Sequence, residues 1–324
     1  MRAVDLDRML EKCRTNQWKV TDLDWSRKPR SMNDDDETAI VQYFTDMAEI
    51  ERLAGALFRE QRRRATDPTL RAIFATFVAD EERHAATAER LASFYDVHRY
   101  RSYRISGSLA AFAPHFLRAI TYLSDDVANA YVTGGELILD IALLRSINDY
   151  VKDEMSEEAM RLINRDESRH IAIDYHMVEY YSSPEYTERL ASRHARTPLP
   201  EQARAFWTFA NVIYRAKPFF QDVFFQPMER VDPSGKRLRE AIRRFQLLGD
   251  KPGVADRPFG KFMRVVQQLY LHPVIGPLAS RVLSRLAGVE PRFMEQLNTD
   301  QELERARTMS YETLAEEALA AKLD

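Results

Sequence analysis

The sequence is short of cysteine and of glycine, and each shortage excludes a class of structure. Cys13 is the only cysteine among 324 residues, which excludes a disulfide framework and a thiolate metal site. The chain has only 10 glycines, while 30% of its residues are charged. This composition favours long helices over an architecture of strands and turns, so we predict an all-α fold.

The sequence also lacks a long apolar run and a strong charge of either sign. Its first residues do not form the apolar segment of a signal peptide, and no uncharged stretch of about 18 residues follows. The 47 basic and 50 acidic residues leave a net charge of -3. We therefore expect a cytoplasmic protein that has neither nucleic acid nor a membrane as a partner.

Capping residues divide the middle of the chain into four predicted helices. Each predicted start is a short polar side chain followed by an acid or by proline, residues that suit the first turn of a helix. Ser156-Glu157-Glu158 marks the start of the last of the four. The predicted spans are about 33–64, 67–95, 124–151 and 156–182.

The connections predict how these helices are arranged. Short turns join the first helix to the second and the third to the fourth, so each pair forms a hairpin. The connection between the hairpins, about thirty residues, is long enough to cross the end of a four-helix bundle. We predict an N-terminal arm at 1–33, the bundle at 34–184, and a helical extension packed on it at 185–324, where prolines separate shorter helices.

One short pattern occurs in both the second and the fourth predicted helix. Residues 80–84 (Asp-Glu-Glu-Arg-His) and 166–170 (Asp-Glu-Ser-Arg-His) both fit Asp-Glu-x-Arg-His. Residues three apart share a helix face, so the Glu and the His of each copy direct two ligand groups to one point. The rest of each face is apolar, and a carboxylate ionised there needs a compensating cation. The four predicted ligands are Glu81, His84, Glu167 and His170.

The first helix of each hairpin supplies one further carboxylate. Glu51 shares its face with apolar and small residues, whereas the face of Glu49 is polar, so Glu51 is the predicted ligand. Glu136 is the only glutamate of the third helix, and Asp140, one turn later, is the alternative. Glu51 precedes the first motif's glutamate by 30 residues, and Glu136 precedes the second's by 31. Two hairpins that each supply Glu and Glu-x-x-His predict a site for two metal ions.

An aspartate precedes the ligand glutamate in each motif. Asp80 and Asp166 are predicted to accept the free imidazole N–H of the histidine in the opposite hairpin, because metal-bound histidines need such a partner. Arg83 and Arg169 are expected to balance the charge of these aspartates.

These residues resemble the ferritin-like di-iron carboxylate superfamily, and the paired motif is similar to that of its oxygen-activating branch. The branch includes bacterial multicomponent monooxygenases, acyl-carrier-protein desaturases, ribonucleotide reductase small subunits with their oxidase relatives, and arylamine N-oxygenases. The resemblance covers residues 18–182 and implies a ferritin-like four-helix bundle. It also implies that two iron ions are held by Glu51, Glu81, His84, Glu136, Glu167 and His170.

Three positions depart from the patterns of this branch. Ile163 stands where N-oxygenases have an additional histidine ligand, and Ala88 stands where reductase subunits place a radical-bearing tyrosine. Asp174 is an additional acid one turn after His170, and we interpret it either as a seventh ligand or as an acid outside the ligand set.

The resemblance implies an oxygen-dependent oxidoreductase. Two iron ions and dioxygen would oxidise a C–H bond or an amine of a small organic or acyl substrate, free or carrier-bound, with electrons from a donor protein or a reductant. A homodimer is the default expectation. The alternatives are a ferroxidase without an organic substrate, an oxidase similar to the reductase small subunit, and a structural protein in which the metal only braces the fold.

Overall fold

Helices joined by turns and short loops make up the structure, a computed structural model that describes residues 4–100, 102–196, 198–287 and 295–321. No strand occurs within these ranges, which confirms the all-α fold. The ends of the predicted arm and extension, at 1–3 and 322–324, lie outside the described residues, as do 288–294 within the extension.

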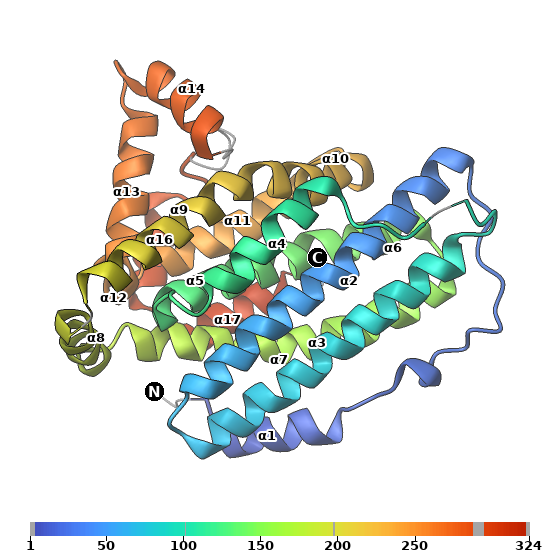
Figure 1. The fold of residues 1–324 in the computed structure, drawn as a ribbon, viewed down its shortest axis with the longest axis horizontal. Coiled ribbons are helices and arrows are strands. Elements are labelled where there is room, and N and C mark those ends of the chain that lie inside the picture. The colour runs from blue at the N-terminus through green and yellow to red at the C-terminus, as the bar shows by residue number, and fades with distance from the viewer. Residues whose placement is uncertain (1–3, 101, 197, 288–294, 322–324) are drawn as a thin grey trace.

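Four long helical runs surround a common core (Figure 1). They are α2 (Asp34–Arg64), α3 (Pro68–Tyr95), a third run made of α5 (Asp125–Leu137), η2 (Ile138–Leu144) and α6 (Arg145–Val151), and α7 (Glu154–Tyr181). The helix α2 packs against α3, α3 against α7, α7 against α5, and α5 against α2. The two predicted hairpins therefore close into a four-helix arrangement.

The first two helices begin at the predicted caps, and the fourth does not. The Asn33 side chain accepts a hydrogen bond from the amide of Asp36, and Pro68 occupies the first turn of α3. The predicted start of the fourth helix at Ser156 is wrong. Lys152 has a φ of 49°, which ends α6, and Asp153 then caps α7 by accepting from the amide of Met155. Ser156 consequently lies inside α7 and is buried.

Two further features differ from the predicted bundle. The connection between the hairpins contains the helix α4 (Gly107–Ala119), which packs against α2 and α9 instead of only crossing the end of the bundle. The third helical run is α-helical at both ends but π-helical at η2, where each turn is one residue wider. This wide turn begins two residues after Glu136.

The N-terminal arm lies along the first hairpin and α7. It contains α1 (Leu6–Thr15), which packs against α3 and α7, and the short turn η1 (Val20–Asp22), which packs against α3. Cys13 is fully buried there as a small apolar residue, and burial raises the pKa of its thiol.

The extension after α7 is a series of shorter helices (Figure 1), and α8, α12 and α13 begin at proline. The helix α11 packs on η2 and α5, α17 packs on α7, and α9 packs on α4. Their bounds are α8 (Pro184–Arg196), α9 (Leu199–Phe220), η3 (Gln221–Phe225), α10 (Gln226–Val231), α11 (Lys236–Gly249), α12 (Pro252–Ala255), α13 (Pro258–Leu271), α14 (Gly276–Ala287), α16 (Asp300–Thr308) and α17 (Tyr311–Ala320).

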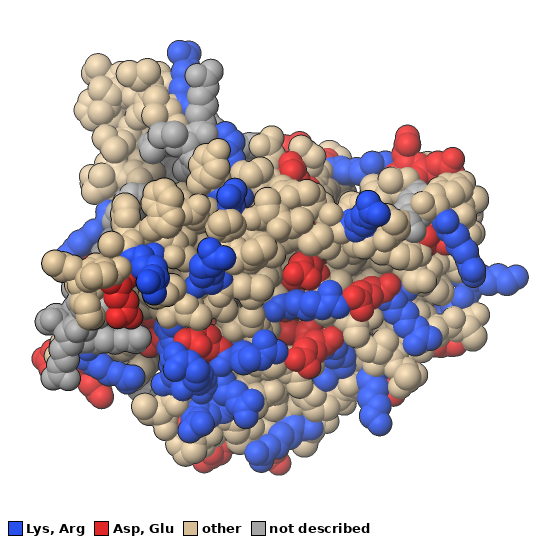
Figure 2. Space-filling view, viewed as in Figure 1, with Lys and Arg blue, Asp and Glu red and all other residues tan. Residues whose placement is uncertain are grey.

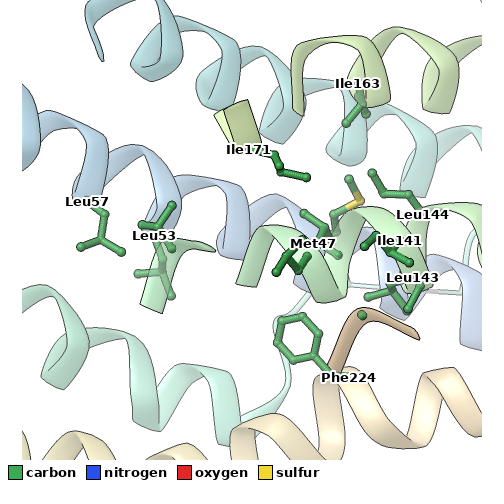
Figure 3. Packing of buried hydrophobic residues seen from close by; sticks show 14 of the residues in the cluster. Met47, Leu53, Leu57, Ile141, Leu143, Leu144, Ile163, Ile171 and Phe224 are labelled. Atoms are coloured by element: carbon green, nitrogen blue, oxygen red, sulfur yellow. The ribbon is translucent and has the colours of Figure 1, made fainter. Parts of the chain in front are cut away.

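The apolar core joins the bundle to the extension. Figure 3 shows Met47 of α2, Ile141 of η2 and Ile163 of α7 packed in one cluster with Phe224 of η3. In the described part of the chain, one helical run, Asp125–Val151, is long and apolar enough to cross a membrane. Because 71% of its most apolar window is buried, and core helices meet the same criteria, the run is weak evidence for a membrane span.

The closest approach of α2 and α3 depends on Gly55. A Cβ atom at this position would lie 3.1 Å from the Cβ of Glu81, which is tighter than almost all real contacts. We therefore expect Gly55→Val to force the two helices apart and to lower the free energy of unfolding by about 1–3 kcal/mol. Urea unfolding measures the change.

Gly135→Ala is the matched control, because Gly135 is also within a helix but has no atom within 4 Å of the added methyl group. This change should leave stability unchanged or raise it by up to about 1 kcal/mol. Equal stability of Gly55→Val and the wild type would contradict close packing at Gly55.

Candidate metal centre

The helices bring all six predicted ligands together in the middle of the bundle. Glu81 and His84 lie one turn apart on α3, and Glu167 and His170 do the same on α7. Glu51 of α2 and Glu136 of α5 complete the set. None of the six side chains is more than 5% exposed, so their charges are removed from water.

Within the described residues, these side chains form two overlapping groups that can each hold a metal ion. One group is Glu51, Glu81, His84 and Glu167, and the other is Glu81, Glu136, Glu167 and His170. In each group the candidate ligand atoms lie within 4.8 Å of one another. Glu81 and Glu167 belong to both groups, so their carboxylates can bridge two ions, while each remaining carboxylate serves one.

The inner nitrogen of each histidine faces the shared carboxylates. Nδ1 of His84 lies 3.0 Å from Oε1 of Glu167, and Nδ1 of His170 lies 2.9 Å from Oε2 of the same residue. Nδ1 of His170 is also 3.1 Å from Oε1 of Glu81. Both imidazoles therefore present Nδ1 as the ligand atom.

The outer nitrogens bind the two motif aspartates across the bundle. Nε2 of His84 on α3 lies 3.1 Å from Oδ2 of Asp166 on α7, and Nε2 of His170 on α7 lies 3.4 Å from Oδ2 of Asp80 on α3. This is the crossed arrangement that the sequence predicts. Each aspartate holds a histidine of the opposite hairpin by its outer nitrogen, which leaves Nδ1 directed into the site.

The two arginines of the motifs neutralise these aspartates. Arg83 contacts both Asp80 and Asp166, with 3.0 Å between its Nη2 and Oδ2 of Asp166. Arg169 also contacts both, at 3.3 Å from Oδ2 of Asp80 and 2.7 Å from Oδ1 of Asp166. The pKa of Asp166 is low although burial raises it, because His84 and Arg169 stabilise its carboxylate.

The arm supplies two further polar contacts that the sequence does not predict. The indole N–H of Trp18 donates to Oδ2 of Asp166 at 2.7 Å, and the Gln17 amide donates to Oδ1 of Asp80 at 3.1 Å. The guanidinium of Arg83 lies over the Trp18 ring at 5.1 Å. The sequence places Trp18 in an arm against the bundle, but no local pattern identifies which of its atoms meets the site.

Burial and mutual repulsion raise the pKa values of three of the four glutamates. Burial, then repulsion by Glu167, raises the pKa of Glu51 to about 7, and the same two causes raise the pKa of Glu136. Burial and the other three carboxylates raise the pKa of Glu81 well above its usual range. For Glu167, burial is outweighed by His170 and His84, which lower its pKa.

Without metal, the raised pKa values of the two histidines keep them protonated, so their positive charge takes the place of the ions' charge. Burial opposes protonation, but Asp166 and Glu167 raise the pKa of His84 to about 10. Glu167 and Asp80 similarly raise the pKa of His170 to about 9. A metal ion would displace these protons, since Nδ1 must be unprotonated to act as a ligand.

The unsatisfied atoms of the site fit two dications. In the described structure, both carboxylate oxygens of Glu81 and of Glu167, and Nδ1 of His84 and of His170, are buried and form close ion pairs with one another but no well-directed hydrogen bond. Such atoms are costly in an apolar interior unless a cation binds them. Four carboxylates balance the charge of two divalent ions, and carboxylate oxygens with imidazole nitrogens are common ligands of divalent transition metals. The buried Glu and His residues can therefore hold metal.

Three other acids considered from the sequence lie outside both groups. Glu49 is on the outer side of α2 and forms an ion pair with Arg52. Asp140 is buried in η2. Asp174 is fully buried, its pKa is raised chiefly by burial, and Thr133 is close enough to its carboxyl group to lower that pKa partly. Both carboxylate oxygens of Asp174 are buried without a hydrogen-bond partner in the described structure, so the seventh ligand and the acid outside the ligand set both stay predictions.

Apolar aromatic side chains pack against the His170 side of the site. The rings of Phe77 and Phe58 lie 4.1 and 5.1 Å from the ring of His170, measured between centroids. Both phenylalanines are fully buried. Tyr43 is a further aromatic residue that sequence reasoning missed. Its hydroxyl is buried, and burial with the nearby Glu51 raises its pKa.

A small apolar cavity of ≈ 100 Å³ adjoins the site. Glu51 and Glu136, the two carboxylates that each belong to one group, are among its lining residues. The other walls come from α2, α4, α5, η2, α9 and η3, so the extension contributes to them. The aromatic lining residues are Phe112, Phe116, Phe219, Phe220 and Phe224.

Comparisons with known proteins add no relative to this description. No family model, no curated protein and no solved structure matches the chain.

The pKa values predict how the metal-free protein responds to pH. Between its ordinary pKa of 4.5 and about 7, Glu51 holds a proton in the folded state that it has lost in the unfolded state. His84 and His170 likewise keep a proton in the folded state that they have lost in the unfolded state, from pH 6.5 to about pH 9. Stability therefore falls as pH rises through this window. The pKa shift of Glu51 alone changes the free energy of unfolding by about 3 kcal/mol at most.

We expect protein kept free of metal with a chelator to unfold at lower urea concentration at pH 9 than at pH 6. Glu51→Gln should reduce the difference, because it removes one of the titrating groups. Metal-loaded protein should show the opposite trend, since protons compete with the ions for the ligands. Rising stability of the metal-free protein between pH 6 and 9 would contradict the pKa assignments.

Proposed function

We propose that this protein is an oxygen-dependent oxidoreductase of the ferritin-like di-iron carboxylate superfamily. Two iron ions would be held by Glu51, Glu81, His84, Glu136, Glu167 and His170. The observation that carries the proposal is that Glu81 and Glu167 are shared by two ligand groups while each group keeps its own histidine and its own carboxylate. A site that only braces a fold has no need for two ions side by side.

The residues around the site suit redox chemistry more than static binding. When bound, a pair of iron ions supplies the electrons that reduce dioxygen. Asp166 and Asp80 hold His84 and His170 in one orientation, so the ligands need not rearrange when the charge of the site changes. Phe58 and Phe77 exclude water from the side of His170.

The cavity indicates the class of substrate. It is bounded by Phe112, Phe219 and other apolar side chains, and its only charged lining residues are the two ligand carboxylates. A wholly apolar cavity of about 150 Å³ accepts benzene, so the present smaller one suits an uncharged apolar group smaller than a ring, such as a short alkyl segment. Hydroxylation, desaturation and N-oxygenation of such a group are all compatible with this shape. A ferroxidase has no use for an apolar cavity at this position.

Metal content tests the site. After anaerobic addition of ferrous iron and removal of the excess, we expect two iron ions per chain by elemental analysis. Glu51→Ala and Glu136→Ala should each retain one ion, because each removes a ligand from a single group. Glu81→Ala should weaken both positions, because its carboxylate is shared.

Glu49→Ala is the matched control, since Glu49 is on the same helix as Glu51 but forms an ion pair with Arg52 on the outer side. It should keep both ions, and circular dichroism should show that all variants are folded. Two ions in both Glu51→Ala and Glu136→Ala would refute these carboxylates as ligands, and fewer than two ions in the wild type would refute the two-ion site.

Oxygen consumption separates oxidation of a substrate from iron storage. The protein loaded with two ferrous ions should consume oxygen in roughly stoichiometric amount and show a transient optical absorption. It should not continue to oxidise added iron. Sustained uptake of many ferrous ions per chain would support the ferroxidase alternative instead.

A further inference from the structure

The helices α13 and α14 form a pair that projects from the rest of the molecule (Figure 1). They pack against each other, and α14 also contacts α9. The pair has no role in holding the predicted ligands, which lie in α2, α3, α5 and α7. Its surface therefore requires a separate explanation.

Apolar side chains are exposed from the middle of α13, over the connecting turn, to the middle of α14. Val265 and Leu269 of α13 are four residues apart, as are Leu278 and Val282 of α14, so each pair lies on one side of its helix, while Leu271 ends α13 at the turn. Between the helices they continue over the connecting turn. We call this set the α13–α14 patch: Val265 (53% exposed), Leu269 (39%), Leu271 (50%), Val274 (79%), Ile275 (43%), Leu278 (67%) and Val282 (46%). An apolar surface that is continuous in this way indicates an interaction site.

The segment that carries the patch has basic residues but no acid, and the acid just before it, Asp256, pairs with Arg264 at its base. Residues 257–282 contain four basic residues and no acid, whereas the chain as a whole has a net charge of -3. Lys261, Arg264 and Arg281 are exposed beside the apolar residues. On the face drawn in Figure 2, the projection carries Lys and Arg atoms but no Asp or Glu atoms. The patch is therefore complementary to a surface that is both apolar and negatively charged.

The dimensions of the helices limit what that surface is. The helix α13 has 14 residues and α14 has 12. At 1.5 Å per residue each is only about 20 Å long, too short to cross a bilayer. Helices with apolar residues on one side and cations beside them lie instead in the interface between lipid headgroups and acyl chains.

We propose that the α13–α14 patch docks this protein on an anionic lipid bilayer. The apolar residues of the turn enter the interface, and Lys261 and Arg281 contact the lipid phosphates and carboxylates. A second copy of the chain is a poorer occupant. A two-fold contact would bring the same patch against itself, so its cations would face one another without an acid to balance them.

The packing of α9 connects the docking surface to the cavity. The helix contacts α14, and it exposes Phe206, Trp207 and Tyr214, all at about 70%. Aromatic residues of this kind are common where proteins meet the headgroup region. At its C-terminal end, α9 continues into η3, and Phe219 and Phe224 of these two segments line the cavity. A bilayer is also the natural reservoir of an uncharged apolar molecule.

Flotation of the full-length protein with vesicles tests the proposal. We expect binding to phosphatidylcholine vesicles that contain about 30% phosphatidylserine, and weaker binding when the salt concentration is raised. Lys261→Gln and Arg281→Gln should each reduce the partition coefficient about fivefold. Val274→Asp should reduce it about tenfold, because it places a carboxylate at the part of the patch that enters the lipid.

Val97→Asp is the matched control, because Val97 is equally exposed (53%) but lies in the turn after α3, outside the patch. It should bind like the wild type. Unchanged circular dichroism and metal content in all variants would separate loss of docking from loss of the fold or of the metal site.

Three results would overturn the proposal: no binding to anionic vesicles, equal binding to vesicles of phosphatidylcholine alone, or unchanged binding of Val274→Asp. If Val274→Asp instead converted a dimer to a monomer in sedimentation equilibrium, the patch would be a contact between two copies of the chain. None of these results depends on the oxidoreductase function.

Discussion

The burial of four carboxylates and two imidazoles at one point of the helical core is the constraint on which the rest of this structure depends. Glu51, Glu81, Glu136 and Glu167 are almost completely removed from water, where like charges repel strongly and hydration is lost. Protons on the histidines compensate part of the charge, and two dications would compensate it fully. The core therefore requires positive charge beside the carboxylates, from protonated histidines or from bound metal ions.

The surrounding residues make this charge arrangement rigid. Asp80 and Asp166 each hold the histidine of the opposite helix, and Arg83 and Arg169 each contact both aspartates. The helices α3 and α7 are thus joined by a nearly symmetric network. Buried polar contacts that cross between two helices in this way favour one geometry over others. The symmetry of the two motifs in sequence becomes a symmetry of contacts around the site.

The remainder of the molecule is asymmetric and gives the site its surroundings. The first hairpin packs against the N-terminal arm, whose Trp18 and Gln17 extend the polar network outward. The second hairpin packs against α11 and α17 of the extension, while α9 and η3 reach the cavity beside Glu51 and Glu136. The polar side of the site thus faces the arm, and the apolar side faces the part of the chain that also carries the α13–α14 patch.

The sequence by itself determined the all-α class, most of the helix boundaries, and which six side chains meet. Caps and residues spaced by three depend on helix geometry alone, so Asn33, Pro68 and the two Glu-x-x-His pairs could be interpreted locally. The sequence also identified Glu51, and not Glu49, as the buried ligand, because the spacing of apolar residues shows which face of α2 is buried.

Only the tertiary structure decided the features that depend on contacts between distant segments. The start of α7 follows from the left-handed Lys152, and the hydrogen bond of Trp18 joins residues 148 apart. The cavity walls come from helices far apart in the sequence. A net charge near zero conceals a basic projection, because composition averages over the chain, whereas folding separates charges in space.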